Sequence, residues 1–297
     1  MPRSGTLLCL SSGAAFGAMG VFGKLAYDSG ATVGTLLPVR FLVAAGLFWG
    51  LLLVGGDRGA IRTVARRDVV LGLLLGAAGY AVQAGAYFAA LTRIDASLLS
   101  LLVYTFPAMV AAAAIALGRE QVDARRMSAL GLACGGLVLV VAGAGTGALD
   151  ALGSALGLAA AVTYSAYILI SDGVARRVAP RMLAALVCSG AAATLTAGSL
   201  LLGGLHPGAV TAAGWGWLAG LAVISTVGAI SLFFAGLRRV GPTSAAILAT
   251  VEPLVTILLA FLAFGEMLGS VQLVGGALVL GSVVVLSARA RAGCAAA

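Results

Sequence analysis

The sequence predicts an all-α integral membrane protein with ten transmembrane helices, arranged as two inverted five-helix repeats with both termini in the cytoplasm. Three observations predict this fold class. Of the 297 residues, 61% are apolar and only 9% are charged, which is too little polar surface for a soluble protein of this length. Apolar runs of about 20 residues, long enough to span ~30 Å of hydrocarbon, recur along the whole chain. The chain also resembles itself after a shift of 146 residues.

The apolar runs define ten expected spans, separated by short connections. The spans are residues 5–27, 32–54, 69–91, 96–117, 127–143, 150–171, 181–203, 211–236, 242–264 and 270–288. Because the first run continues to Tyr27, we interpret it as a span and not as a cleaved signal peptide. The longest connection, residues 55–68, is too short to hold a soluble domain. The sequence has no G-x-x-x-x-G-K-[ST] phosphate loop, which argues against an ATP-driven pump.

Basic residues are concentrated in alternate connections. Fifteen of the eighteen Lys and Arg residues lie near the N-terminus or after an even-numbered span. By the positive-inside rule, this distribution predicts that both termini are cytoplasmic. The net charge of +8 is therefore explained by membrane topology, and it does not predict a nucleic-acid partner.

The internal repeat divides the chain into residues 1–145 and 146–297. The matched pairs that are least expected from the composition are Phe88 with Phe234, Arg93 with Arg239, Pro107 with Pro253 and Glu120 with Glu266. Each half holds five spans, and an odd number of spans inserts the second copy upside down. Two similar halves of opposite orientation can exchange inward-open and outward-open shapes around a site between them. The repeat therefore favours transport over other activities.

Short motifs at matching positions carry a resemblance to a known family. They are Pro38-Val-Arg-Phe41, Phe106-Pro-Ala-Met, Leu117-Gly-Arg-Glu120, Glu252-Pro-Leu-Val and Phe264-Gly-Glu266. With ten spans in two halves, the whole chain resembles the drug/metabolite transporter superfamily, EamA type. The resemblance implies a metabolite carrier, often an exporter of amino acids or related solutes. It also implies a central cavity lined mainly by spans 1, 3, 4, 6, 8 and 9.

Glu252 is a carboxylate inside an apolar run, next to Pro253. An ionised carboxylate at the bilayer centre costs about 2.5–3.5 kcal/mol by insertion scales, so Glu252 should face a wet cavity, find a partner or hold a proton. Two interpretations stay open: a proton-coupling or substrate-amine site, and a structural hydrogen bond between helices. Pro107 and Pro253 remove a backbone hydrogen bond in each half, and we expect them to kink their spans or act as hinges.

Two cations lie in the half of the membrane that the positive-inside rule makes the outer one. Lys24, the only lysine, is near the end of span 1, and Arg40 is close to the centre of span 2. Either could pair with Glu252 or bind a substrate carboxylate. The alternative for Lys24 is snorkelling to the headgroups. The alternative for Arg40 is a structural tie, which the EamA resemblance favours because span 2 is peripheral to the cavity.

Five of the six tyrosines lie within spans and not in interfacial belts. Two helical faces carry the same i, i+3, i+7 spacing: Tyr80, Gln83 and Tyr87, then Tyr164, Tyr167 and Ser171. Lipid offers no hydrogen-bond partners, so both faces should point into one cavity; hydrogen bonds between helices without a ligand are the alternative. The expected substrate-binding residues are Phe16, Tyr80, Gln83, Tyr87, Tyr104, Tyr164, Tyr167, Thr250 and Glu252.

Small residues four apart let helices approach closely, and packing is their expected role. Such pairs are Gly13 and Gly17, Gly72 and Gly76, and Gly131 and Gly135.

The function expected from these observations is secondary transport, with export of small organic metabolites by alternating access. An uncoupled facilitator is the first alternative, and a receptor or assembly protein that does not transport is the second. The sequence has no nucleophile–base pair and no metal cluster at membrane depth, so we expect no enzyme activity, catalytic residue, metal or cofactor. The expected partners are a small-molecule substrate and the lipid bilayer; a homodimer is left open. The Arg-rich, Ala/Gly-rich composition suggests the cytoplasmic (inner) membrane of a bacterium.

Overall fold

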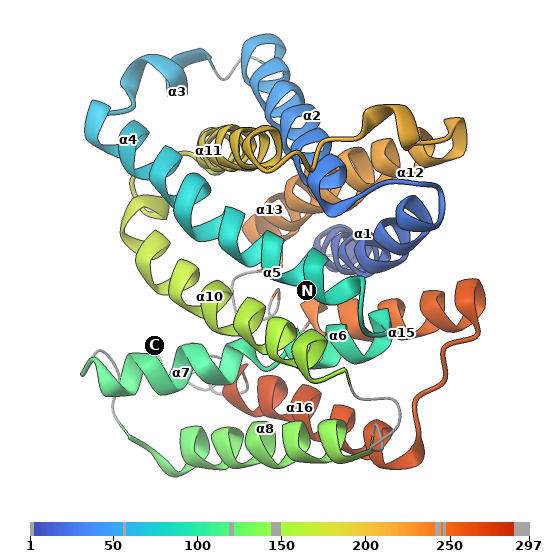
Figure 1. Cartoon of the computed structure of the whole chain (residues 1–297). Coiled ribbons are helices and arrows are strands. Elements are labelled where there is room, and N and C mark those ends of the chain that lie inside the picture. Colours follow the sequence, from blue (N-terminus) through green and yellow to red (C-terminus); the bar gives the residue numbers. More distant parts are fainter. Residues whose placement is uncertain are drawn as a thin grey trace.

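The computed structural model describes residues 3–55, 58–118, 122–143, 150–240, 245 and 248–287. Within these residues all regular structure is helical (Figure 1). Eight described segments are long and apolar enough to cross a membrane, and two shorter apolar helices, Val251–Phe264 and Ser270–Val285, follow them. Glu120, the boundary between residues 145 and 146, and parts of the predicted ninth and tenth spans lie outside the described residues.

The first half of the chain closely follows the predicted spans. Its helices are α1 (Arg3–Asp28), α2 (Val33–Val54), α3 (Arg58–Thr63), α4 (Arg66–Leu74), α5 (Ala81–Leu91), α6 (Ala96–Val103), α7 (Phe106–Ala116) and α8 (Ala124–Gly143). The short helix α3 lies within the longest predicted connection, residues 55–68. A π-helical turn, Leu75–Tyr80, joins α4 to α5, so the third span is one helix with a local widening.

The second half repeats this pattern. Its helices are α10 (Ala151–Ala175), α11 (Pro180–Leu201), α12 (Ala212–Ala222), α13 (Ala229–Val240), α15 (Val251–Phe264) and α16 (Ser270–Ser287). A π-helical turn, Val223–Gly228, joins α12 to α13, at the place that corresponds to the turn in the third span. A short 3₁₀ turn, Pro207–Ala209, follows α11.

The contacts between helices follow the symmetry of the two halves. Helix α2 packs against α11, and α8 against α16; the latter two lie side by side along one edge of the bundle (Figure 1). Helix α1 packs on α13, and in the same way α10 packs on α5. Large apolar side chains such as Val54 and Leu201 point outward and are almost fully exposed, as expected for surfaces that face lipid.

Ion pairs at the two ends of the bundle fix the direction of α10. Asp150, just before α10, pairs with Arg93, just after α5, at 3.1 Å. At the opposite end, Arg177 follows α10 and pairs with Asp68 near the start of α4 at 2.6 Å. Lys24, near the end of α1, contacts Asp95, two residues beyond Arg93. Helix α10 therefore runs opposite to α1. We call the two ends the Lys24 end and the arginine-rich end.

Two of the three predicted glycine pairs lie at close helix contacts. A Cβ on Gly76 would lie 2.0 Å from the carbonyl oxygen of Val187 in α11, and one on Gly17 would lie 2.7 Å from the carbonyl oxygen of Glu252 in α15. The prediction is wrong for Gly131 and Gly135, which have open space beside them. Helix α8 instead uses a neighbouring glycine, Gly136, against Gly275 of α16, because that side of α8 faces the bundle.

We expect Gly76→Ala and Gly190→Ala each to destabilise the protein by about 1–3 kcal/mol, since an added methyl group overpacks the contact with a neighbouring backbone. The added Cβ would lie 2.0 Å from a backbone oxygen in both cases, that of Val187 and that of Leu73. The measurement is thermal unfolding in detergent. Gly85→Ala is the matched control, because no atom lies within 4 Å of its Cβ position. Unfolding of both variants at the control's temperature would contradict the contact.

Candidate functional site

A cavity of about 400 Å³, which we call the central cavity, is lined by residues of both halves. At the arginine-rich end it reaches Ala175 and Pro180, which are exposed. Toward the Lys24 end it stops at Phe88, Ser100 and Thr256, all of which are buried. The volume lies within the range of small-molecule sites. The cavity is therefore open at one end of the bundle and closed at the other.

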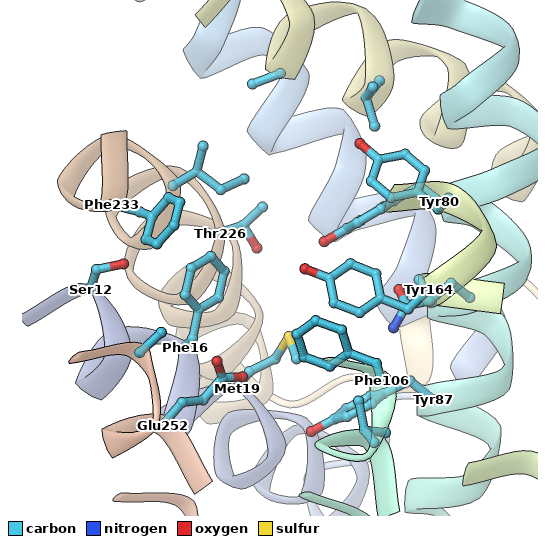
Figure 2. A pocket seen from close by; sticks show the side chains of 18 of the residues that line it. Ser12, Phe16, Met19, Tyr80, Tyr87, Phe106, Tyr164, Thr226, Phe233 and Glu252 are labelled. Carbon is cyan, nitrogen blue, oxygen red and sulfur yellow. The ribbon is translucent and has the colours of Figure 1, made fainter. Parts of the chain in front are cut away.

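Two tyrosine-bearing faces meet at this cavity. All six residues of the two predicted faces line it: Tyr80, Gln83, Tyr87, Tyr164, Tyr167 and Ser171. The rings of Tyr80 and Tyr167 meet edge to face at 5.4 Å, and those of Tyr164 and Tyr167 stack at 6.2 Å. Figure 2 shows Tyr80 and Tyr164 across the open space from Phe16 and Glu252. Aromatic rings with hydroxyl groups suit small amphipathic solutes.

Each half contains a helix that is interrupted just before a proline. The fourth span breaks at Tyr104 and Thr105, and Pro107 is the second residue of α7. The counterpart break lies at Thr250, and Pro253 is the third residue of α15. Helices α7 and α15 thus both start beside the cavity, an arrangement typical of the discontinuous helices of transporters.

A hydrogen bond joins the two interruptions. Pro253 has no N–H, so the carbonyl of Ala249, four residues earlier, lacks its helical donor. The Tyr104 hydroxyl donates to that carbonyl at 2.6 Å. The proline of one half therefore leaves an acceptor that a tyrosine of the other half satisfies, and the two breaks are held in contact.

Glu252 lies in the first turn of α15, half-buried, and lines the cavity. The positive end of the helix dipole stabilises a carboxylate at this position. Thr256 Oγ1 donates to the backbone carbonyl of Glu252 at 3.1 Å and to that of Gly17 at 3.0 Å. Among the described residues, no hydrogen bond or ion pair reaches the Glu252 carboxylate itself. Its oxygens are left to face the cavity, where an ammonium group or a proton can reach them.

Arg40 reaches the same cavity from α2. Its side chain is buried, and its Nε donates to Thr226 Oγ1 at 3.0 Å. The expectation that span 2 is peripheral is wrong at this point. The long side chain allows this residue of α2 to line the cavity, although α2 packs mainly on α11 and α12.

Lys24 does not pair with Glu252. Its ammonium lies 2.6 Å from Glu266 Oε1 and 3.3 Å from Asp95 Oδ1. Glu266 also accepts the backbone N–H groups of Ala96 and Ser97 and the Ser97 hydroxyl. It thereby caps α6, whose own N-cap residue, Asp95, makes no side-chain hydrogen bond to the N–H groups of the helix. We call Lys24, Asp95, Ala96, Ser97 and Glu266 the Lys24 cluster. It ties α1 and α6 of the first half to Glu266, which lies two residues beyond α15 in the second half.

The Lys24 cluster is expected to make stability sensitive to acid. Burial alone would raise the pKa of Glu266, but Lys24 and the Ser97 N–H and hydroxyl outweigh it and hold that pKa below its ordinary value. A lowered carboxyl pKa stabilises the folded state above pH ~4–5, and this contribution is lost as pH falls through the lowered pKa. Between pH 6 and 3, the free energy of unfolding should fall by about 1 kcal/mol more in the wild type than in Glu266→Gln. Thermal unfolding at each pH measures this difference. The same pH dependence of unfolding in the two proteins would contradict a stabilising contact between Lys24 and Glu266.

Sequence comparison identifies the family. The profile of the EamA-like transporter family matches residues 3–142 and again residues 151–288. The chain belongs to the EamA-like transporter family. It is 29% identical over 253 residues to an "uncharacterized transporter" of Archaeoglobus fulgidus, covering 85% of this chain and 87% of that protein. It is 25% identical over 287 residues to the "uncharacterized transporter YcbK" of Bacillus subtilis, covering 92% of this chain and 89% of that protein.

A solved crystal structure shares the fold. The TM-score is 0.65 at 20% sequence identity, with 98% of this chain and 99% of the other covered. Family, relatives and apolar helices together make this EamA-like chain a multi-pass membrane protein of a transporter family.

Some predicted site residues lie elsewhere in this EamA-like fold. Thr250 does not line the cavity; it is the N-cap residue at the break before α15, and its neighbours Ala249 and Glu252 line the cavity instead. Pro107 and Lys24 also lie outside the cavity lining, at an interruption and at the closed end. Phe16, Tyr104 and Pro253 line it together with the tyrosine faces, Arg40 and Glu252.

Sequence reasoning missed part of the lining. Phe106, the repeat counterpart of Glu252, lines the cavity, and its ring packs on Tyr164 at 4.7 Å. The repeat alignment already paired the two positions and could have indicated this. Helix α11 contributes Pro180, Leu183 and Cys188, although span 7 was not expected at the cavity. These residues are apolar or small, so their sequence pattern does not distinguish cavity from core.

Proposed function

We propose that the protein is a secondary transporter that exports small organic metabolites, such as amino acids or related amphipathic solutes, through the central cavity by alternating access. In this proposal ten spans form two inverted halves in the cytoplasmic membrane of a bacterium, with both termini inside. The EamA-like family and two relatives described as transporters support the general activity. The opposite directions of α1 and α10 support the inverted arrangement.

The observation that carries the proposal is a cavity that contains a carboxylate and a guanidinium and whose lining is exposed at the arginine-rich end and buried at the Lys24 end. The arginine-rich end is cytoplasmic by the positive-inside rule, so this conformation faces inward. Access from the other side requires the Lys24 cluster to separate while the arginine-rich end closes. Because one chain supplies both halves of the cavity, a homodimer is not required for transport.

The test is transport by purified protein in liposomes. A panel of amino acids and small amines is added to proteoliposomes that hold a pH gradient, and both solute counterflow and internal pH are recorded. Solute movement that dissipates the gradient supports a coupled exporter. Movement that is independent of the gradient identifies an uncoupled facilitator of the same solutes. Absence of flux for every solute, in protein that binds them, would favour a receptor.

A further inference from the structure

Arg40 is held in one orientation by its surroundings. It is 2% exposed, and its guanidinium lies over the rings of Phe41 and Phe88, at 5.0 and 5.3 Å from their centroids. Its Nε donates to Thr226 Oγ1, and that hydroxyl in turn donates to the carbonyl of Leu221 at 2.9 Å. The Thr226 hydroxyl proton is therefore committed to Leu221, and its oxygen is free to accept from Arg40.

The π-helical turn of the eighth span places this acceptor. Thr226 lies within the turn Val223–Gly228, where backbone hydrogen bonds run from residue i+5 to residue i. The wider turn lets the Thr226 side chain bond Leu221 five residues earlier. Thr226 is itself fully buried and lines the cavity beside Arg40. The π-helical turn in the second half of the chain thus positions the hydroxyl group that orients the Arg40 side chain.

The rest of the guanidinium has no acidic partner among the described residues. One of its five N–H donors is used by Thr226, and the other four are on the two terminal nitrogens. The guanidinium also lies within hydrogen-bonding reach of the Tyr80 hydroxyl, which lines the same cavity and leaves terminal donors for a ligand. Lys24, Arg93, Arg176 and Arg177 each pair with a carboxylate at an end of the bundle. Arg40 forms no ion pair with any described carboxylate, although a cation at membrane depth is costly without one. Its side chain lines the cavity, so an anion inside the cavity can reach it.

We propose that Arg40, oriented by Thr226, is a carboxylate-binding site in the wall of the central cavity and selects solutes that carry a carboxylate. The two terminal nitrogens of a guanidinium match the two oxygens of a carboxylate in a bidentate pair. The rings of Phe41 and Phe88 stack on the cation and exclude water from its faces. This inference rests on the proposed function, and it deepens it by naming the chemical group that the cavity recognises.

The test compares three ligands of similar size: 3-phenylpropionate, phenethylamine and phenylalanine. Binding to purified protein is measured by calorimetry. We expect wild-type protein to bind both carboxylates, and Arg40→Gln to lower the ratio of 3-phenylpropionate to phenethylamine affinity by about 10- to 100-fold, as for a lost charged hydrogen bond. Arg40→Lys keeps the charge without the fork and should give an intermediate ratio. Thr226→Val should lower the ratio less than Arg40→Gln, since it loosens the orientation alone.

Arg93→Gln is the matched control, because it removes a cation from an exposed pair at the Lys24 end. Size-exclusion profiles and unfolding temperatures show whether each variant is folded. An unchanged ratio in folded Arg40→Gln or Arg40→Lys would overturn the site, as would wild-type protein that binds only the amine or none of the three ligands. Carboxylate binding that depends on Arg40 without flux in liposomes would keep the site and reject the transporter.

Discussion

Glu252→Gln is expected to reduce substrate-driven proton movement to the level of empty liposomes. The carboxylate faces the central cavity from the first turn of α15, and no described residue bonds to its oxygens. A proton and a substrate ammonium group can therefore compete for the same site, which couples their movements in opposite directions. The amide of glutamine has a similar shape but carries neither charge nor a titrating proton. The measurement is internal pH in proteoliposomes after addition of each solute.

Two controls separate coupling from folding. Glu252→Asp keeps a carboxylate, shortened by one methylene, and should retain part of the proton movement. Glu252→Gln protein should still be monodisperse and unfold near the wild-type temperature, because the side chain has no hydrogen-bond partner among the described residues to lose. If Glu252→Gln exchanges solute and dissipates the gradient as the wild type does, the carboxylate is not the coupling group. The protein would then be a passive carrier or use another acid.

The overall fold could be predicted largely because the bilayer imposes it. Hydrocarbon thickness sets the length of apolar runs, and the described helices begin and end within a few residues of most predicted spans. Local irregularities were less predictable. Pro107 and Pro253 indicated a kink, but not that Tyr104 would bond the carbonyl that Pro253 leaves free. The π-helical turns have no proline to indicate them, and they depend on contacts with other helices.

The candidate site could be predicted where polar chemistry interrupts an apolar span. The hydroxyls of Tyr80 and Tyr164 required a polar environment, and that requirement placed them at a cavity. Partners far apart in sequence were not predictable by the same logic. Lys24 and Glu266 are separated by 242 positions, and nothing in either local sequence favours this pair over Lys24 with Glu252. Only the packing of α1 against α6 and α15 decides it.

Lys24→Met is expected to open the closed end of the cavity. The ammonium bonds Glu266 and Asp95, and it is the only side chain of α1 that forms an ion pair with the other half among the described residues. Loss of a tie of about 1–2 kcal/mol changes the balance between two conformations by about 5- to 30-fold. The readout is a cysteine at Leu91, which is buried beside Gly23 of α1, in protein with the native cysteines replaced. Labelling of Leu91→Cys by a membrane-impermeant maleimide should rise by that factor when Lys24→Met is added.

Exposure and burial decide which ion pair can act in this way. Arg93 and Asp150 also join the two halves at the Lys24 end, but their side chains are 43% and 35% exposed, and exposed pairs contribute little. The Glu266 side chain is only 5% exposed, and it holds the start of α6 as well as Lys24. Arg93→Met should therefore leave the labelling rate at the wild-type value, while Glu266→Gln should raise it. Equal rates for Lys24→Met and Arg93→Met would mean that packing of the α1 glycines, and not the ion pair, closes this end.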